Sequence, residues 1–364
     1  MPMITYTDDL APQPLAHARA LPAWFYTDAG SDLLDRSAVF AHGWQLVAHA
    51  SALNQSGDHV VTEIAGVPLL LVRGDDGALR ALHNVCRHRA GPLATCDGRG
   101  AKRLRCQYHG WSYALDGQLL SATEMGEAEG FDVSAVRLPE ARVAEWLGLV
   151  FACLDDNAPP LSEVLEGIRE RIGPRSLEHY RFHQRVVYDI ACNWKTYIDN
   201  YLEGYHVPHI HPELNAMLDY RSYIVETAPW HSLQYSPLES GEGLYGKGEA
   251  LYYTIWPNTL LNILPGRLQT NRVLPLGVDR CRVTFDYYYP PEADPAEVAE
   301  RHQRDHAFSD LVQRQDVDMC EIVQRNLASG SYHAGRLNPK REDAVHHFQE
   351  LLRAAYRRYA GTRG

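Results

Sequence analysis

Short runs of alternating or continuous apolar residues dominate the chain between Trp44 and Leu154. Such runs are typical of strands, and Asp76-Gly77 and Asp116-Gly117 are typical of hairpin turns between strands. The strands predicted from these runs are 44–49, 59–66, 67–74, 78–85, 108–115, 118–120 and 146–154. This part of the chain therefore predicts a small antiparallel β domain.

The second half of the chain mixes helical and strand periods. Residues 161–172 have helical spacing, and a further helix is predicted to begin after Asn193, which can serve as its N-terminal cap. The other predicted elements are strands at 181–192, 251–264, 267–277 and 281–290, and helices at about 296–327 and 344–359. An antiparallel sheet around one long C-terminal helix is an α+β arrangement that leaves a deep pocket between helix and sheet.

Two boundaries divide the chain into a lead-in and two domains. The lead-in is predicted to be helical and loop-like, with Ser31 or Asp32 as the cap of a short amphipathic helix that runs to Phe40. The segment 155–160 ends in two prolines and is a natural linker. We therefore expect a lead-in, a β domain and an α+β domain at 1–40, 41–158 and 159–364.

Composition narrows the class of protein. The chain has 364 residues, 45% hydrophobic and 22% charged, which is ordinary for a globular protein of two domains. A formal net charge of −11 without a long basic run argues against nucleic acid as a partner, and a glycine-rich phosphate loop is missing. The apolar runs are far shorter than the ~18 residues of a membrane span, and seven cysteines are too few for a disulfide scaffold. We therefore expect no membrane partner and a cytoplasmic location.

The densest group of possible metal ligands occupies nine residues of the second domain, and consists of Glu203, His206, His209 and His211. Two histidines and one carboxylate around an open iron form the facial triad of non-haem Fe(II) oxygenases. His206 and His209 would share a face of an unbroken helix, whereas His206 and His211 would not. Pro208 favours a helix break near Val207, which would bring His211 back to the same site. Solvated surface histidines are the alternative that this spacing alone leaves open.

Two further pairs of possible ligands lie in the β domain. Cys86 and His88 form one pair, and Cys106 and His109 form the other. A tetrahedral zinc site of two cysteines and two histidines is one interpretation. The alternative is a Rieske [2Fe–2S] centre, in which the cysteines hold one iron and the histidines the other. The mixed composition of each pair favours the second interpretation, because zinc fingers typically pair cysteine with cysteine at a short spacing.

The segments CRHRAGPL and CQYHGWSY resemble the two cluster loops of Rieske non-haem iron oxygenases, in their alpha (oxygenase) subunit. The resemblance covers nearly the whole chain and is strongest to choline monooxygenase-like members, with further similar segments IWPNTLLN, LQTNRVLPLG, CRVTFDYYYP and DMCEIVQRNLASGSY. It implies an antiparallel β Rieske domain followed by a catalytic domain of helix-grip (START-like) fold. It also implies a [2Fe–2S] cluster on Cys86, His88, Cys106 and His109.

The resemblance also assigns the mononuclear iron site. It implies that His206, His211 and Asp316 bind Fe(II) and that His209 is only a neighbour. Glu203 matches the carboxylate that links an iron histidine, here His206, to a cluster histidine, His109 of the partner subunit. The subunits would then form a homotrimer or a stacked hexamer.

The implied activity is that of a terminal oxygenase that uses O2 and electrons from NAD(P)H. A separate flavin and iron–sulfur reductase, possibly with a ferredoxin, would deliver them. The substrate expected from the resemblance is a quaternary ammonium compound of choline or betaine type, which the enzyme would hydroxylate or N-demethylate. Aromatic residues bind such cations, and the candidates near the expected pocket are Tyr201, Tyr205, Trp230, Tyr253 and Trp256.

Two other functions stay open. The same aromatic walls would suit an aromatic or heterocyclic substrate. A Rieske-type electron carrier is the non-enzymatic alternative, but a carrier needs only the first domain. It would leave the stretch with His206 and His211 without a role.

Overall fold

The computed structural model describes residues 8–218, 220–238, 244–291 and 295–361. The chain divides into two compact units, one formed by residues 40–161 and the other by residues 1–39 together with 162–364. The predicted lead-in therefore packs with the C-terminal part of the chain, and its residues 1–7 lie outside the described residues.

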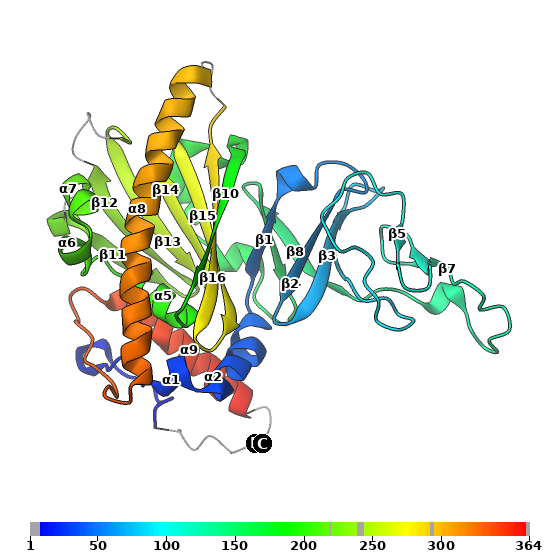
Figure 1. Cartoon of the computed structure of the whole chain (residues 1–364), viewed down its shortest axis with the longest axis horizontal. Coiled ribbons are helices and arrows are strands. Elements are labelled where there is room, and N and C mark those ends of the chain that lie inside the picture. Colours follow the sequence, from blue (N-terminus) through cyan, green and yellow to red (C-terminus); the bar gives the residue numbers. More distant parts are fainter. Residues whose placement is uncertain (1–7, 219, 239–243, 292–294, 362–364) are drawn as a thin grey trace. The chain divides into compact units, whose positions relative to one another are not determined.

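The unit of residues 40–161 contains two antiparallel sheets (Figure 1). The larger sheet has the strand order β1-β9-β8-β4-β3-β2, with bounds Gln45–His49, Leu149–Cys153, Glu140–Trp146, Leu79–His83, Val67–Arg73 and His59–Ile64. The smaller sheet comprises β5 Leu104–Arg105, β6 Ser112–Tyr113 and β7 Leu119–Ser121. The expected antiparallel β domain is confirmed, but strand β8 was not predicted because its charged residues hide the alternation.

Strand β3 separates two hydrophobic cores, because successive side chains of a strand point to opposite faces. Leu69 and Leu71 belong to one core, and Leu70 and Val72 belong to the other. The second core also contains the two loop cysteines of the sequence pairs, Cys86 and Cys106, which are both buried. The cysteine loops are therefore anchored on the sheet by ordinary apolar packing.

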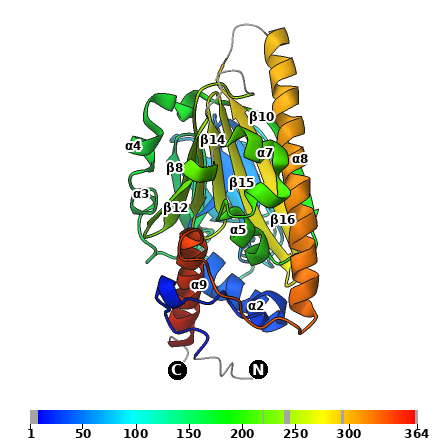
Figure 2. The same cartoon turned by 90° about the vertical axis from the view of Figure 1, so that its left-hand side faces the viewer.

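The larger unit is built on a seven-stranded antiparallel sheet with the order β10-β16-β15-β14-β13-β12-β11. The bounds of these strands are Arg181–Ile190, Arg280–Tyr289, Arg267–Gly277, Thr259–Leu264, Gly248–Ile255, His231–Leu238 and Ile224–Ala228. Figures 1 and 2 show the long helix α8 (Pro295–Ala328) running along one face of this sheet, with α5 (Trp194–Tyr201) beside it. The predicted α+β class with a long C-terminal helix is thereby confirmed.

Shorter helices complete the chain. Helix α9 (Asp343–Gly361) packs against β11 and β12. The other α-helices are α1 Trp24–Thr27, α2 Ala29–Leu34, α3 Leu161–Val164, α4 Ile168–Ile172, α6 Val207–Ile210 and α7 Pro212–Met217. The 3-10 turns are Leu15–His17, Ala50–Ala52, Val133–Ala135, Gly173–Arg175, Leu177–His179 and Tyr220–Ser222, and a π-helical turn spans Asp35–Phe40. Within the described part of the chain, none of the helices combines the length and apolar character of a membrane span.

Several details of the predicted elements are wrong. Strands β5, β11 and β12 were not predicted, and only Ser112–Tyr113 of the predicted strand 108–115 is a strand. The cap of α2 is Asp28, whose carboxylate accepts from the backbone N–H of Gly30, and Ser31 lies inside the helix. The predicted helix 161–172 is two helices, because Gly167 has φ +78° and interrupts it. The predicted strand 251–264 is a hairpin that turns after Ile255.

A buried ion pair joins the N-terminal residues to helix α5. Lys195 and Asp35 are both fully buried and paired, and Asp35 also accepts from the indole of Trp194 at 2.8 Å and from the hydroxyl of Tyr356. Burial raises the pKa of Asp35 and lowers the pKa of Lys195. The pair stabilises the fold only while both partners are present.

Replacing Lys195 by methionine should therefore lower the free energy of unfolding by about 3–5 kcal/mol, because a buried carboxylate is left without its cation. Chemical denaturation followed by circular dichroism measures this change. The matched control is Arg282→Met, which removes the cation of a solvent-exposed pair with Asp189 and should change stability by about 0–1 kcal/mol. Equal losses in the two variants would contradict the role of the Asp35 pair.

Candidate functional site

The histidine-rich stretch begins with helix α5. The side chain of Asn193 accepts from the backbone N–H of Lys195 at 3.0 Å, which confirms the predicted cap. The helix ends at Tyr201, and α6 begins at Val207 with Pro208 in its first turn. The predicted break near Val207 is thus misplaced. A first-turn proline needs no N–H partner, so Pro208 starts a helix here and the break precedes it.

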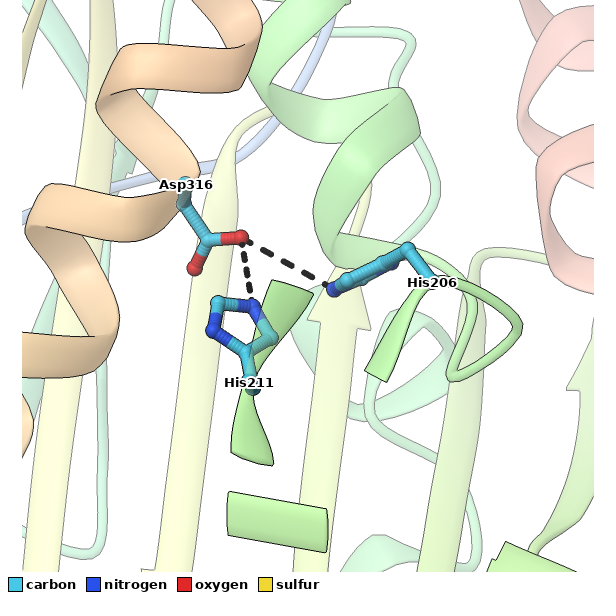
Figure 3. Close-up of side chains that lie close together, drawn as sticks. All are labelled: His206, His211 and Asp316. Atoms are coloured by element: carbon cyan, nitrogen blue, oxygen red, sulfur yellow. Dashed lines mark hydrogen bonds and ion pairs between the residues drawn. The ribbon is translucent and has the colours of Figure 1, made fainter. Parts of the chain in front are cut away.

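His206, His211 and Asp316 converge on one point (Figure 3). One ligand atom from each lies within 4.8 Å of the other two. Nε2 of His211 is 3.0 Å from Oδ1 of Asp316, and Nε2 of His206 is 3.7 Å from the same oxygen. His209, the other histidine of the stretch, is exposed, and so is Asp318, the next acid along the chain after Asp316. The structure therefore brings together the three residues expected as iron ligands.

Polar neighbours hold both imidazoles in the orientation that a metal requires. Nδ1 of His206 lies 2.6 Å from the carboxylate of Glu203, and Nδ1 of His211 lies 2.7 Å from the amide oxygen of Gln315. Both oxygens can accept an Nδ1 proton, which leaves each Nε2 available to a metal ion. Asn200 donates to Oδ1 of Asp316 at 2.7 Å. The contacts of Gln315 and Asn200 were not predictable from sequence, because they connect segments far apart in the chain.

Electrostatics also favour a cation at this point. Burial disfavours the charged form of His211, but hydrogen bonding to Asp316 outweighs burial and the pKa of His211 is raised. A metal ion between His211 and Asp316 would take the place of the proton that the raised pKa of His211 favours. Two neutral imidazoles and one carboxylate are the donor set of mononuclear Fe(II) sites with open positions, so the residues fit the expected metal.

These three residues line a cavity of about 120 Å³ between α5, α8 and the sheet, which we call the triad cavity. Its aromatic lining residues are Tyr197, Tyr201, Tyr223, Tyr245, Tyr252, Phe285 and Phe308. Gly204 makes room for one of them, because a Cβ atom there would lie 2.8 Å from the ring of Tyr223. The cavity therefore combines these rings with aliphatic and polar side chains, and its lining includes the metal-binding residues.

Of the five predicted aromatic residues, Tyr201 lines this cavity and the other four lie outside its lining. Tyr253 is next to Tyr252 on β13 and points to the opposite face, where its ring faces His231. Trp256 packs on Phe348 in the turn after β13. The cavity lining does not include Trp230, and Tyr205 is exposed. Side chains alternate along β13, so Tyr252 could have been identified as a lining residue if the face of the strand that meets the cavity had been known.

A second cavity has a volume of about 460 Å³. Glu203 lines both cavities, and Asp199 and Glu342 are further acidic residues of the second one. Burial raises the pKa of Asp199 to about 7 and also raises the pKa of Glu342. Glu203 therefore contacts His206 and also lines the acidic second cavity.

The two cysteine–histidine loops have the same backbone hydrogen bonds. In the first loop, the N–H of Cys86 donates to the carbonyl of Gly91, and the N–H of Ala90 donates to Cys86. In the second, the N–H of Cys106 donates to Trp111, and the N–H of Gly110 donates to Cys106. The loops are thus closed in the same way and each presents one thiol and one imidazole.

The loops approach each other closely. A Cβ atom on Gly91 would lie 2.8 Å from the sulfur of Cys106, so glycine is required there. Nδ1 of His88 lies 3.1 Å from Nδ1 of His109, and Tyr113 contacts the sulfur of Cys86 at 3.2 Å. Desolvation and the nearby His88 lower the pKa of His109, which keeps its imidazole neutral for metal binding. Paired thiols and paired imidazoles fit a two-iron cluster with two ligands of each kind.

Both units match known families. Residues 177–358 match the family described as the ring-hydroxylating alpha subunit (catalytic domain), and residues 43–137 match the Rieske [2Fe-2S] domain. Chloroplastic choline monooxygenase of Arabidopsis thaliana is 35% identical over 355 residues, which cover 93% of this chain and 83% of that protein. The carnitine monooxygenase oxygenase subunit of Escherichia coli strain K12 is 30% identical over 362 residues, which cover 93% and 94%.

Solved structures show the same similarity. A quaternary ammonium Rieske monooxygenase in complex with its substrate L-carnitine aligns with a TM-score of 0.82 and 27% identity, covering 95% of this chain and 99% of that one. A further structure of such a monooxygenase, which bears on carnitine oxidation and inter-subunit electron transfer, aligns with a TM-score of 0.85 at 27% identity and the same coverage. Naphthalene 1,2-dioxygenase from Rhodococcus aligns with a TM-score of 0.77 at 18% identity, over 93% and 94% of the two chains, and shares the fold.

Proposed function

The chain belongs to the Rieske oxygenases of the ring-hydroxylating type, as an alpha (oxygenase) subunit, and from this we propose that it hydroxylates a carbon next to the nitrogen of a quaternary ammonium compound. The observation that carries the proposal is the triad cavity, in which aromatic rings surround the space beside His206, His211 and Asp316. Aromatic faces attract quaternary ammonium groups through cation–π interactions. The relatives named for choline and carnitine oxidation support the same substrate class.

The reaction balances with two external electrons. The substrate carbon R–CH2–N(CH3)3⁺ takes one oxygen atom of O2 to give R–CH(OH)–N(CH3)3⁺, and two electrons and two protons reduce the other oxygen to water. The hydroxylated product then breaks its C–N bond to give an aldehyde and trimethylammonium. The same hydroxylation on a methyl group releases formaldehyde, which is N-demethylation.

The protein residues have separate roles in this scheme. We assign His206, His211 and Asp316 to the mononuclear iron, and Cys86, His88, Cys106 and His109 to the cluster. When bound, the iron supplies open positions for O2 and the cluster supplies single electrons. Glu203 and Gln315 hold the Nδ1 protons of the two iron histidines. The aromatic lining orients the substrate and excludes water from the reacting carbon.

Electron delivery is proposed to cross a subunit boundary in a head-to-tail homotrimer, or in a stacked pair of trimers. Glu203 would link His206 to His109 of the partner subunit, and the second cavity beside Glu203 supports this role because it leaves that side of the carboxylate open to a partner. A heterologous interface can close into such a ring. We further propose Rieske and catalytic domains at 41–158 and 159–364, and a separate NAD(P)H-dependent flavin and iron–sulfur reductase as donor, with or without a ferredoxin.

Oxygen uptake by the complete protein with a reductase tests the function. Choline, γ-butyrobetaine and L-carnitine are compared with indole and naphthalene, and trimethylamine and formaldehyde are measured as products. We expect coupled uptake with at least one quaternary ammonium compound and none with the aromatic compounds. Coupled uptake with the aromatic compounds alone would favour the aromatic alternative. Cluster reduction without any substrate-dependent uptake would favour an electron carrier.

A further inference from the structure

Three polar residues line the triad cavity from one face of strand β15. Arg267, Gln269 and Asn271 are spaced by two, so their side chains share a face, and at most 5% of each is exposed. A sheet face that packs on a helix is ordinarily apolar, because buried polar groups destabilise a fold unless they are hydrogen-bonded. We call this row the polar ladder.

Hydrogen bonds link the polar ladder to helix α8. The guanidinium of Arg267 donates to Asp305, to the hydroxyl of Tyr245 and to the amide oxygen of Gln269. The amide of Gln269 donates to Asn271 at 2.7 Å. Asp305 also accepts from the hydroxyls of Tyr245 and Tyr289. The negative charge of Asp305 is therefore shared among three donors, and it compensates the charge of Arg267 only in part.

Two buried donors of the same cavity are without an acceptor. Among the described residues that line it, the buried side-chain nitrogen and oxygen atoms without a hydrogen-bond partner are Nε of Arg267 and Nε2 of Gln313. Both atoms carry protons, so each calls for an acceptor. A carboxylate has two oxygens that only accept, and it suits two such donors, one of them cationic.

The positions of Asp305, Gln313 and Asp316 along α8 indicate in which direction a bound ligand extends. Asp305, Ser309, Gln313 and Asp316 follow at steps of four, four and three residues, and thus share one helix face. Gln313 is about 4.5 Å along the helix axis from Asp316, and Asp305 is roughly 16 Å from it. The donors therefore lie to one side of the metal-binding triad, and a ligand bound to them extends toward the triad.

The other end of the ligand would meet aromatic rings. Tyr201, Tyr223 and Tyr252 line the same cavity, and the rings of Tyr201 and Tyr252 lie 6.5 Å apart at 83°. Tyr201 belongs to α5, the helix that leads into the iron histidines. A cationic group among these rings is accommodated by cation–π interactions without a counter-charge.

We propose that the triad cavity selects zwitterionic substrates, in which a carboxylate binds Arg267 and Gln313 and a quaternary ammonium group binds among Tyr201, Tyr223 and Tyr252. This inference rests on the proposed function and narrows its substrate class to betaine-type compounds. Choline has no carboxylate, so it leaves both donors unsatisfied. A betaine-type compound has a carboxylate for the two donors and a quaternary ammonium group for the aromatic rings.

Binding measured without turnover tests the proposal. Isothermal titration calorimetry on the metal-loaded protein, without reductase, compares γ-butyrobetaine with its methyl ester and with choline. The ester keeps the ammonium group and the chain but has lost the negative charge. We expect γ-butyrobetaine to bind on the order of 10- to 100-fold more tightly than the ester, as for hydrogen bonds to a charged group.

Variants assign this preference to the named donors. In Arg267→Gln and in Gln313→Met, the dissociation constant of the methyl ester divided by that of γ-butyrobetaine should fall toward one. Gln313→Met leaves the Arg267–Asp305 pair intact, so this variant still tests carboxylate selection if Arg267→Gln does not fold. The matched control is Arg185→Gln, which removes the cation of the Arg185–Asp286 pair on the same sheet, away from the cavity lining, and should keep the wild-type ratio.

The outcomes separate this inference from the proposed function. If the acid, the ester and choline bind equally well to the wild-type protein, carboxylate selection is overturned and quaternary ammonium oxidation stands. An undiminished ratio in Gln313→Met and in a folded Arg267→Gln would also overturn it. If none of the three probes binds, the proposed function and this inference fail together.

Discussion

Asp316→Ala should abolish the mononuclear iron site and lower turnover by about three orders of magnitude or more, while the visible spectrum of the cluster stays unchanged. The carboxylate oxygen of Asp316 is 3.0 Å from Nε2 of His211 and 3.7 Å from Nε2 of His206, so its loss removes one of the three proposed ligands. A metal centre contributes several kcal/mol to a barrier, and each 1.4 kcal/mol is tenfold in rate. The cluster residues lie in the other unit and keep their contacts.

Elemental analysis for iron, with substrate-coupled oxygen uptake, measures both parts of this prediction. Asp318→Ala is the matched control, because Asp318 is exposed two residues further along α8 and should keep iron and activity. The histidines supply a second pair of variants, in which His211→Ala loses iron and the exposed His209→Ala retains it. Loss of iron from the His209 variant and not from the His211 variant would show that the ligand pair is wrongly assigned.

Glu203→Gln should leave both metals bound and still reduce turnover steeply, by about 10- to 100-fold or more. The carboxylate of Glu203 accepts from Nδ1 of His206 at 2.6 Å and from its backbone N–H at 3.0 Å. A neutral amide of the same size orients the imidazole less strongly. It also removes the negative charge that would interact with a histidine of the partner subunit. Glu170→Gln is the control, since Glu170 is an exposed carboxylate of α4 that lines neither cavity.

Mixing experiments test whether electrons cross between subunits. Cys106→Ala subunits lack a cluster but keep Glu203, whereas Glu203→Gln subunits keep the cluster. Subunit exchange between two nearly inactive parents creates interfaces that join an intact cluster to an intact iron site with Glu203, so activity should return in part. Mixed trimers that stay inactive would restrict Glu203 to a local role at His206.

The parts of the site that were predictable from sequence are those whose residues are close together in the chain. Cys86 and His88, like Cys106 and His109, belong to single loops, so their chemistry is visible as spacing. Asp316 lies 105 residues after His211, and only the resemblance to a family pointed to it. The structure then placed its oxygen at the two histidines, while its role as an iron ligand stays a prediction.

The aromatic walls were not predictable because they depend on strand register. Tyr252 and Tyr253 are adjacent and chemically alike, and only the pairing of β13 with its neighbours decides which of them faces the cavity. A similar limit applied to Pro208, since proline can end a helix or occupy its first turn. Strand β8 was missed because charged residues interrupt its apolar pattern, although Ala141 and Val143 pack on a hydrophobic core.

The matching backbone bonds of the two cysteine–histidine loops bear on how the cluster is acquired. Each loop is closed by its own N–H and carbonyl groups, and both cysteines are anchored in a core of ordinary side chains. The loops therefore lose their conformational entropy when the chain folds and not when iron arrives. Cluster insertion then resembles loading a rigid chelator, unlike a zinc finger, whose folding depends on its metal. We therefore expect folding to precede cluster insertion.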